Sequence, residues 1–473
     1  MPATAPAAAA VLVPALLLLM LLLPSPSPLF PLLAPQPAGA TPTGVMPQLR
    51  DPALAVERFS SIIPNSPTTL AFVGEGDVLV LQKTDGQVRL IRDGVLQGQP
   101  VLDANVANAG EQGMLGIAVV VANGEGGSSN SGSSKKVYLY FSESDRDGGE
   151  AIAKRVYSYD WDGSSLSNPV LLRDLRATQF YHNGGGMVAA PDGAVYLVLG
   201  DAGRYGALQN HSKELFEDTS VIMRIDREGD PYHAIGVRNS FGLAIDPVTG
   251  RLWDTENGDD YYDEINLVEE KMNSGWDVVM GPATEDALAR IPQYLDYRYS
   301  DPEFSWERPV APTGLAFVGS GPLQEEYGDS LFVGDCNNGN LYRFVLNESR
   351  DGFVFAQASP LQDGVAGAGE PQDEIIFGTD FGCVTDVEVG PDGLLYVLSL
   401  SEGTIFRIGP KDVIAALLSS SAVSAGGGGP LQQAFQSPAQ LAVYSSVAAA
   451  GAAAAGVYVL RRRKSKNNNN KPL

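Results

Sequence analysis

The chain has 473 residues, of which 53 are glycine and 32 are proline, and its formal net charge is −24 at pH 7. This length suits one large domain or two domains of medium size. Nucleic-acid binding requires clustered Lys and Arg, so we expect no nucleic-acid partner for so acidic a chain. The many turn residues, and the scarcity of long helical periodicities in the middle of the chain, predict an all-β protein.

Residues 1–40 are predicted to be a signal peptide that is not part of the fold. The apolar run from Val11 to Leu23 has the length of a signal-peptide core, and Ala38-Gly39-Ala40 has the small-x-small form of a cleavage site. The start of the chain lacks the usual Lys or Arg, so an uncleaved anchor is the alternative. We therefore expect an exported protein.

Residues 41–410 carry a weak repeat of six units, each built from apolar strands joined by glycine-containing turns. The units are Thr69–Leu96, Gly113–Leu166, Gly184–Glu228, Gly242–Val268, Thr313–Phe353 and Thr385–Ile408. Six β units at regular spacing predict a six-bladed β-propeller, in which each unit is one four-stranded blade. A β-sandwich or two unrelated β domains are the alternatives. Loops from all blades of a propeller converge on one channel, so distant residues can build one site.

Three histidines are candidates for acid–base chemistry, and His182 has the most informative surroundings. It stands in Tyr181-His-Asn-Gly-Gly-Gly186, and glycines beside a histidine allow a substrate to approach the ring closely. Asp201 ends the strand pair that follows, where a carboxylate can orient the ring and stabilise its protonated form. A purely structural His–Asp pair is the alternative. His211 and His233 are weaker candidates.

A predicted β-hairpin in the fourth unit leads into an unusually acidic loop. The loop has five carboxylates within nine residues: Glu256, Asp259, Asp260, Asp263 and Glu264. Such closely spaced carboxylates repel one another unless a cation offsets them. Oxygen ligands in a loop that also contains Gly258 suit calcium. A solvated acidic loop is the alternative, since no D-x-D-x-D-G calcium motif is present.

The composition changes after Pro410. Residues 411–440 are predicted to be a flexible linker, since they include a Ser/Ala/Gly-rich stretch. Residues 441–460 contain no charge and are long enough for a transmembrane helix. The basic residues that follow predict that the tail, residues 461–473, stays cytoplasmic. We therefore expect an exported propeller that is anchored to the outer face of the cell membrane by its C-terminal helix.

Several short motifs stand in order between Val56 and Ile408. They are Gly110-Glu-Gln-Gly-Met-Leu-Gly-Ile117, His182-Asn-Gly-Gly, Leu199-Gly-Asp201, Gly236-Val-Arg-Asn239, Glu256-Asn-Gly258, Asp263-Glu-Ile-Asn-Leu267 and Asn273-Ser-Gly-Trp276. This order resembles the glucose/sorbosone dehydrogenase family, which includes soluble quinoprotein glucose dehydrogenase and the aldose sugar dehydrogenases. The combination is far more specific than any single motif.

The resemblance implies a six-bladed propeller that binds pyrroloquinoline quinone (PQQ) with calcium and oxidises the C1 hydroxyl of a sugar to a lactone. By this resemblance His182 is the base and Asp201 orients it. Arg238 and Asn239 contact the quinone oxygens, where negative charge develops on reduction. Glu111 lines the pocket for substrate and cofactor. Electrons pass to an external acceptor that the sequence does not identify.

The resemblance also assigns the calcium ligands. Gly258 and Asp259 offer main-chain oxygens to the calcium that is bound to the cofactor. Asp263 belongs to a neighbouring structural calcium site, and Glu264 is a second candidate for that site.

The chain departs from the family where cationic side chains usually pair with the cofactor's carboxylates. The corresponding stretches, Gly334–Gly339 and Phe381–Thr385, contain no Lys or Arg. Asn337 and Asn338 offer neutral hydrogen bonds instead, which are weaker than charge-assisted ones. Cys336 and Cys383, the only cysteines, fall within these two stretches, and cysteine pairs of exported proteins are usually bridged. We predict a disulfide between them at the channel mouth.

Two rival functions remain open at this point. The first is a non-enzymatic, calcium-stabilised propeller that binds a glycan or a partner protein, which the missing cations favour. The second is a calcium-dependent hydrolase of the lactonase type. His182 with Asp201, and Arg238 with Asn239, favour the dehydrogenase.

Overall fold

The structure is a computed structural model whose described part falls within Thr41–Leu473. The described residues are 43–121, 135–176, 180–203, 218–226 and 232–425. The predicted signal peptide, transmembrane helix and basic tail all lie outside these residues. Among the described helices, none is both long enough and apolar enough to cross a membrane.

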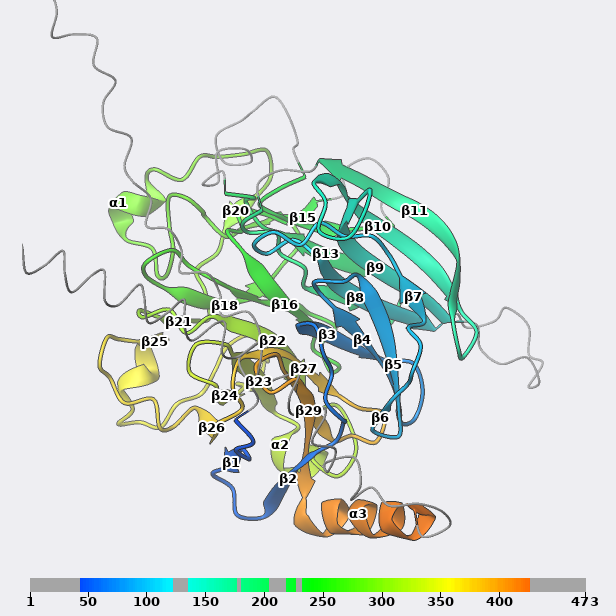
Figure 1. The fold of residues 1–473 in the computed structure, drawn as a ribbon. Coiled ribbons are helices and arrows are strands. Elements are labelled where there is room, and N and C mark those ends of the chain that lie inside the picture. Colours follow the sequence, from blue (N-terminus) through cyan, green and yellow to red (C-terminus); the bar gives the residue numbers. More distant parts are fainter. Residues whose placement is uncertain (1–42, 122–134, 177–179, 204–217, 227–231, 426–473) are drawn as a thin grey trace, which may run out of the picture. The chain divides into compact units, whose positions relative to one another are not determined.

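The described strands form six sheets, one for each unit of the sequence repeat (Figure 1). Each sheet begins with an inner strand. The inner strands are β3 (Pro67–Phe72), β8 (Met114–Val121), β12 (Met187–Ala189), β16 (Ser240–Ile245), β22 (Pro312–Phe317) and β27 (Val384–Val389). Each inner strand contacts the inner strand of the next sheet, and β27 contacts β3, which closes the ring. The predicted six-bladed propeller is therefore confirmed, and we number the blades 1 to 6 in this order.

Blades 1 to 3 continue outward from their inner strands by antiparallel pairing, and blade 3 adds two short parallel strands. Blade 1 contains β4 (Asp77–Gln82), β5 (Gln87–Arg92), β6 (Val95–Leu96) and β7 (Leu102–Asp103). Blade 2 contains β9 (Lys135–Ser144), β10 (Ala151–Trp161) and β11 (Leu166–Arg176). Blade 3 contains β13 (Val195–Leu199), β14 (Val221–Arg224), β15 (Tyr232–Ile235), β19 (Met272–Asn273) and β20 (Arg298–Tyr299).

Blades 4 to 6 follow the same plan, and the last two also take strands from the start of the described chain. Blade 4 contains β17 (Leu252–Glu256), β18 (Asp263–Val268), β21 (Phe304–Trp306) and β25 (Val365–Ala366). Blade 5 contains β23 (Ser330–Asp335), β24 (Leu341–Val345), β26 (Ile376–Thr379) and β1 (Gln48–Leu49). Blade 6 contains β28 (Leu395–Ser399), β29 (Thr404–Pro410) and β2 (Leu54–Arg58). The short helices between strands are α1 (Glu285–Leu288), α2 (Gln324–Tyr327) and the 3-10 helix η1 (Pro360–Asp363).

The N-terminal strand β2 completes blade 6. It pairs antiparallel with β29, and the two strands lie side by side in Figure 1. The buried side chain of Glu57 on β2 accepts a hydrogen bond from Nε of Arg407 on β29, at 2.8 Å. Two ends of the chain that are 350 residues apart therefore hold the ring closed.

Apolar side chains fill the spaces between neighbouring blades. Between blades 4 and 5, for example, Trp253, Phe304 and Trp306 pack with Leu331 and Phe344, and all five are fully buried. Strands that bury both faces in this way read as nearly continuous apolar runs, which explains why the sequence repeat is visible but weak. This packing fixes the loops at either end of the propeller.

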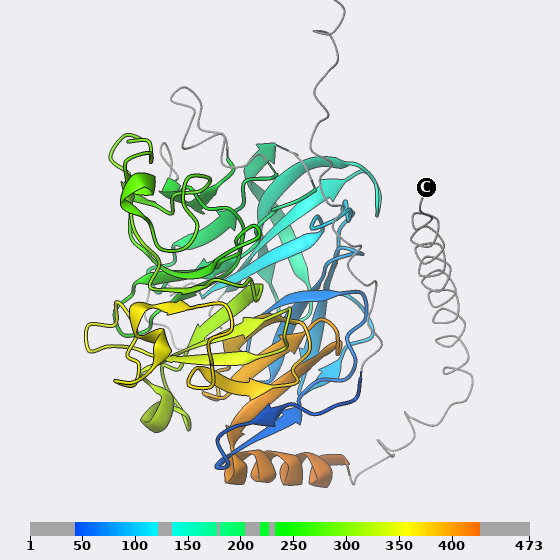
Figure 2. The same ribbon diagram turned by 90° about the vertical axis from the view of Figure 1, so that its left-hand side faces the viewer.

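The helix α3 (Lys411–Ala425) corrects the prediction of a flexible linker over the first part of residues 411–440. Ile414 is 3% exposed, and Val413 and Leu417 pack partly buried beside it. Because these residues recur at helical spacing, they form an apolar stripe that contacts β2 and β29. Figure 2 shows the helix lying across the end of blade 6. The Ser/Ala-rich composition that suggested a linker is compatible with a helix once one side is buried.

Candidate functional site

The predicted site residues of blades 2 to 4 gather at one end of the propeller, which we call the upper face: the end at which the six inner strands begin. In blade 3, His182 precedes β12 and Asp201 follows β13. Because β12 and β13 are antiparallel, these two positions lie side by side. Nδ1 of His182 lies 2.6 Å from Oδ1 of Asp201. With the proton held on Nδ1, the neutral ring leaves Nε2 to act as a base.

The carboxylate of Asp201 is the most constrained member of this pair, being 1% exposed. Oδ1 also accepts from the backbone N–H of Gly203 at 2.7 Å, and Oδ2 accepts from Nε1 of Trp276 at 2.7 Å. Burial alone would raise the pKa of Asp201, but the hydrogen bonds and charge of His182, with those from Trp276 and Gly203, outweigh burial and lower it. Asp201 is therefore ionised and fixed, as an orienting group must be.

The backbone of His182 is in the left-handed region, with φ at 51°. Non-glycine residues adopt this conformation at an energetic cost, and such residues cluster at functional sites. The next turn is equally demanding, since Gly184 has φ at 63° and a Cβ there would lie 2.5 Å from the carbonyl oxygen of Val198. The turn that places the imidazole ring of His182 at the upper face therefore requires the glycines that follow this residue.

Glu111 links three blades at the upper face. Its Oε2 accepts from the backbone N–H of Asn183 at 3.0 Å and from Nδ2 of Asn239 at 3.2 Å. Oδ1 of Asn239 in turn accepts from the backbone N–H of Gly184 at 3.1 Å. Glu111 and Asn239 therefore lie within one hydrogen-bond network that also holds the His182 turn in place.

Arg238 lies at the start of blade 4 with its guanidinium 9% exposed. Its two terminal nitrogens donate to the carbonyl oxygen of Asn257 at 2.9 Å and to Oδ1 of Asp259 at 3.1 Å. The guanidinium carbon also lies 5.2 Å from the centre of the Trp276 ring, within cation–π range. Trp276 therefore touches both the orienting carboxylate of Asp201 and the cation at the site.

Asp263, a predicted ligand of the structural calcium site, already has protein partners for both of its carboxylate oxygens. Oδ1 of Asp263 accepts from the backbone N–H of Gly258 at 2.8 Å, and Oδ2 accepts from those of Val310 and Ala311 at 2.6 and 2.8 Å. The structure therefore uses Asp263 to tie the acidic loop to the start of blade 5. Within the part of the chain that the structure describes, no group of three or more His, Cys, Asp or Glu has metal-binding geometry.

A row of buried carboxylates lies deeper in blade 4. Glu256 on β17 is paired in register with Glu264 on β18, and Asp254 lies two residues before Glu256 on the same face. Burial and the charge of Asp254 raise the pKa of Glu256 to about 8, and burial raises the pKa of Asp254 to about 7. Burial, followed by the charge of Glu256, also raises the pKa of Glu264. These groups repel one another, so a cation bound here would be stabilised.

Blades 5 and 6 contribute differently from blades 2 to 4. Asn337 and Asn338 are exposed at the upper face, in the loop after β23. Nδ2 of Asn337 donates to the carbonyl oxygen of Pro309 at 3.3 Å, and Nδ2 of Asn338 donates to Oδ2 of Asp335 at 3.2 Å. Asn338 thus bonds within its own loop and Asn337 bonds to the segment before β22, and among the described residues no hydrogen bond joins either side chain to the His182 network.

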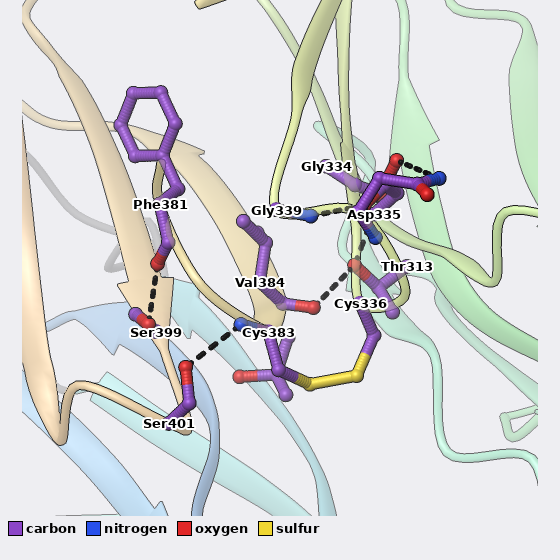
Figure 3. The surroundings of a disulfide bond; sticks show 12 residues. Thr313, Gly334, Asp335, Cys336, Gly339, Phe381, Cys383, Val384, Ser399 and Ser401 are labelled. Atoms are coloured by element: carbon purple, nitrogen blue, oxygen red, sulfur yellow. Dashed lines mark hydrogen bonds between the residues drawn. A yellow bond between two sulfur atoms is a disulfide. The ribbon is translucent and has the colours of Figure 1, made fainter. Parts of the chain in front are cut away.

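The predicted disulfide between Cys336 and Cys383 is confirmed (Figure 3). It joins the end of β23 in blade 5 to the residue before β27 in blade 6. Thr313 reinforces the same junction, since its hydroxyl oxygen lies 3.1 Å from the carbonyl oxygen of Gly334 and 2.9 Å from that of Val384. The two loop stretches that lack Lys and Arg, Gly334–Gly339 and Phe381–Thr385, are therefore linked covalently at the upper face.

Sequence reasoning missed the part that Trp276 and Asp254 play. Trp276 stood in a quoted motif, but nothing in its spacing showed that the indole would reach Asp201, 75 residues away. Asp254 was not among the predicted site residues, although it lies on β17 beside Glu256 and is 1% exposed. Its neighbour Glu256 was counted with the loop, yet the structure buries it completely.

Comparison with known proteins agrees with this fold. The family model described as glucose/sorbosone dehydrogenase matches residues 64–407. The chain belongs to the glucose/sorbosone dehydrogenase family. Among curated proteins, it is 24% identical over 373 residues to the aldose sugar dehydrogenase YliI of Escherichia coli, covering 73% of this chain and 90% of that protein. It is 25% identical over 378 residues to an uncharacterised protein of Synechocystis, covering 72% and 83%.

Solved structures of sugar dehydrogenases share the fold. The PQQ-bound aldose sugar dehydrogenase of Streptomyces coelicolor has a TM-score of 0.55 and 20% identity, covering 76% of this chain and 99% of that chain. The apo form of the soluble aldose sugar dehydrogenase of Escherichia coli has a TM-score of 0.56 and 20% identity, covering 76% and 100%. At this level of identity the likeness establishes the propeller fold.

Proposed function

We propose that this protein is a PQQ-dependent sugar dehydrogenase that oxidises the C1 hydroxyl of an aldose to a lactone and passes the electrons to an external acceptor. The observation that carries the proposal is the His182–Asp201 pair, held at 2.6 Å on the upper face of a propeller of this family. Arg238 and Asn239 lie beside the pair and supply a cation and an amide.

The roles of the two residues follow from the chemistry of the oxidation. Converting the C1 hydroxyl to a carbonyl removes a proton from the oxygen and a hydride from the carbon. Nε2 of His182 accepts the proton, and Asp201 stabilises the resulting imidazolium through Nδ1. PQQ, when bound, supplies the acceptor for the hydride.

The upper face offers some of the groups that a quinone with three carboxylates would need. Arg238 is a buried cation beside Asn239, and together they offer hydrogen-bond donors to oxygens on which negative charge develops. Glu111 holds Asn239 through its Oε2. Asn337 and Asn338 are exposed and would have to leave their partners, Pro309 and Asp335, to meet the cofactor.

We also propose that calcium binds at the acidic loop of blade 4. The main-chain oxygens of Gly258 and Asp259 are the candidate ligands for a calcium ion that accompanies the cofactor, and Asp263 and Glu264 are the candidates for a neighbouring structural site. A divalent cation would offset the repulsion between Glu264 and Glu256, which are paired in register across β17 and β18. To bind it, Asp263 would have to give up backbone hydrogen bonds that both of its oxygens accept, and Glu264 would have to give up those from Gly281 and Asn266.

The second candidate function is a non-enzymatic propeller, stabilised by calcium, that binds a glycan or a partner protein. It is favoured by the pairing of Arg238 with Asp259 and by the engagement of the Asn337 and Asn338 amides with Pro309 and Asp335. In that case the upper face recognises a ligand without carrying out chemistry on it.

Titration of the purified protein with PQQ in the presence of calcium tests the first function against the second. Binding is followed by cofactor absorbance, and a panel of aldoses is then added with an artificial electron acceptor. Saturable binding with sugar-dependent dye reduction supports the dehydrogenase. A folded protein that binds calcium but no PQQ at micromolar concentration would exclude it and favour recognition.

We further propose that the protein is exported and tethered to the outer face of the membrane through residues 441–460. The support is the uncharged run followed directly by basic residues. Protease treatment of intact cells tests this topology. Digestion of the propeller with protection of a short C-terminal fragment is the expected result, and full protection would contradict it.

A further inference from the structure

Lys83 places an ammonium group beside Glu111 on the upper face. Lys83 directly follows β4 in blade 1, and Glu111 stands before β8 in blade 2. Nζ of Lys83 donates to the carbonyl oxygen of Gly110 at 2.7 Å, one residue from Glu111. Burial lowers the pKa of Lys83, and the charge of Glu111 opposes this effect without cancelling it. Lys83 is thus a half-buried cation, and the nearby carboxylate of Glu111 compensates only in part for the effect of burial on its pKa.

The backbone is shaped to hold this lysine. Gly113 has φ at 149°, and a Cβ at that position would lie 2.6 Å from Cγ of Lys83 and 2.4 Å from its carbonyl oxygen. The carbonyl oxygen of Lys83 also accepts from the backbone N–H of Met114 at 3.1 Å. Only glycine leaves room for the lysine stem at this point. The stem therefore has a fixed place between blades 1 and 2.

Lys83 and Arg238 lie on opposite sides of the circle of blades, and the hydrogen-bond network of Glu111 and Asn239 lies between them. Blades 1 and 4 are three steps apart in the closed circle of six. Glu111, beside Lys83, accepts a hydrogen bond from Asn239, which follows Arg238 in the chain. The loops of blades 5 and 6 in this region, Gly334–Gly339 and Phe381–Thr385, contain no Lys or Arg. Lys83 supplies a cation at the junction of blades 1 and 2 instead.

We propose that Lys83 binds a carboxylate of the ligand that occupies the His182 site. This inference rests on the proposed function and adds to it an anion-binding residue in blade 1. An ammonium group has three N–H donors, and only one of them serves Gly110. A ligand carboxylate would accept a charge-assisted hydrogen bond from another of these donors. The carboxylate belongs either to PQQ or to an acidic sugar such as a uronic acid.

Cofactor affinity tests the first source. Three variants of the full chain are compared with the wild type: Lys83→Met, which removes the charge; Lys83→Arg, which keeps it; and Lys136→Met, which removes an exposed lysine from β9. In titrations with PQQ and calcium but no sugar, we expect Lys83→Met to bind about 10-fold to about 100-fold more weakly. Lys83→Arg and Lys136→Met should stay within about threefold of wild type, with unchanged unfolding temperatures.

Substrate affinity tests the second source. With each protein saturated with cofactor, KM is measured for glucose and for glucuronate. A rise in KM for glucuronate alone in Lys83→Met assigns the carboxylate to the sugar. Equal PQQ affinity and equal KM values in wild type and Lys83→Met would overturn this inference and leave the dehydrogenase function standing. Failure of the wild type to bind PQQ or either sugar would overturn both.

Discussion

Nε1 of Trp276 donates a hydrogen bond to Oδ2 of Asp201 at 2.7 Å, while the other oxygen of that carboxylate holds the imidazole of His182. The same indole ring lies 5.2 Å from the guanidinium carbon of Arg238. One buried side chain therefore positions both the base pair of blade 3 and the cation of blade 4. Each contact can be removed separately, which allows its effect on the reaction to be measured.

Trp276→Phe deletes the N–H but keeps an aromatic ring beneath Arg238. The hydrogen bond from Trp276 helps to lower the pKa of Asp201, so its loss makes the carboxylate more basic and strengthens its hold on a protonated ring. We expect kcat/KM to fall about tenfold and the acidic limb of its pH profile to move to higher pH, with PQQ affinity unchanged. Trp276→Leu should lose PQQ affinity as well. An unshifted pH profile in Trp276→Phe would show that the indole has only a packing role.

His182→Ala removes the proposed base. We expect turnover to fall by about 100-fold to about 10,000-fold, with cofactor affinity within about threefold of wild type, because the imidazole acts on the substrate proton. The readouts are dye reduction and PQQ titration. His233→Ala, at the other described histidine, is the matched control and should retain full turnover. Normal turnover in His182→Ala would exclude this residue as the base.

Replacing both Cys336 and Cys383 with Ser opens the covalent link between blades 5 and 6. A disulfide between residues 47 positions apart restricts the unfolded chain, so its loss should reduce the free energy of unfolding by about 2–4 kcal/mol. Urea unfolding of the variant and the wild type measures the difference. Dithiothreitol should destabilise only the wild type, and equal sensitivity of both proteins would argue against the link.

Glu388 gives the stability of the protein a pH dependence. It lies two residues from Asp386 on the same face of β27, and burial, followed by the charge of Asp386, raises its pKa. In the unfolded chain a glutamate has a pKa of about 4.3. As pH rises above that value, the unfolded state releases its proton before the folded state does, so stability falls. Glu388→Gln should therefore gain stability relative to wild type between pH 5 and pH 8 in urea unfolding. Glu348→Gln, at an exposed position, should not, and a parallel gain there would contradict the explanation.

The number of blades could be predicted from the sequence because each unit repeats apolar strands between turn residues. The sequence did not indicate that β2 would join blade 6, since this pairing links strands about 350 residues apart and neither strand carries a signal for the other. The helix α3 was missed for a related reason. Its Ser- and Ala-rich residues form a helix because Ile414 is buried against blade 6, and composition does not show burial.

The candidate site was predictable where its geometry is local. The pairing of His182 with Asp201 follows from the antiparallel strands β12 and β13, which bring the two ends together. The roles of the carboxylates in the acidic loop were harder to predict, since their spacing alone suggests that they act together. The structure separates them: Asp263 binds the backbone of residues 310 and 311, whereas Glu264 is buried in the sheet. That division depends on how blade 5 packs against blade 4.

The pairing of β2 with β29 has a consequence for how the protein is made. The ribosome releases β2 long before β29 is synthesised, so β2 has no strand to pair with until blade 6 is made near the end of the propeller. Unpaired strand edges invite association with other chains, and contacts between residues far apart in sequence form slowly. Closure of the ring is therefore the step at which the nascent chain is most exposed to aggregation, and the step at which a chaperone would have the greatest effect on yield.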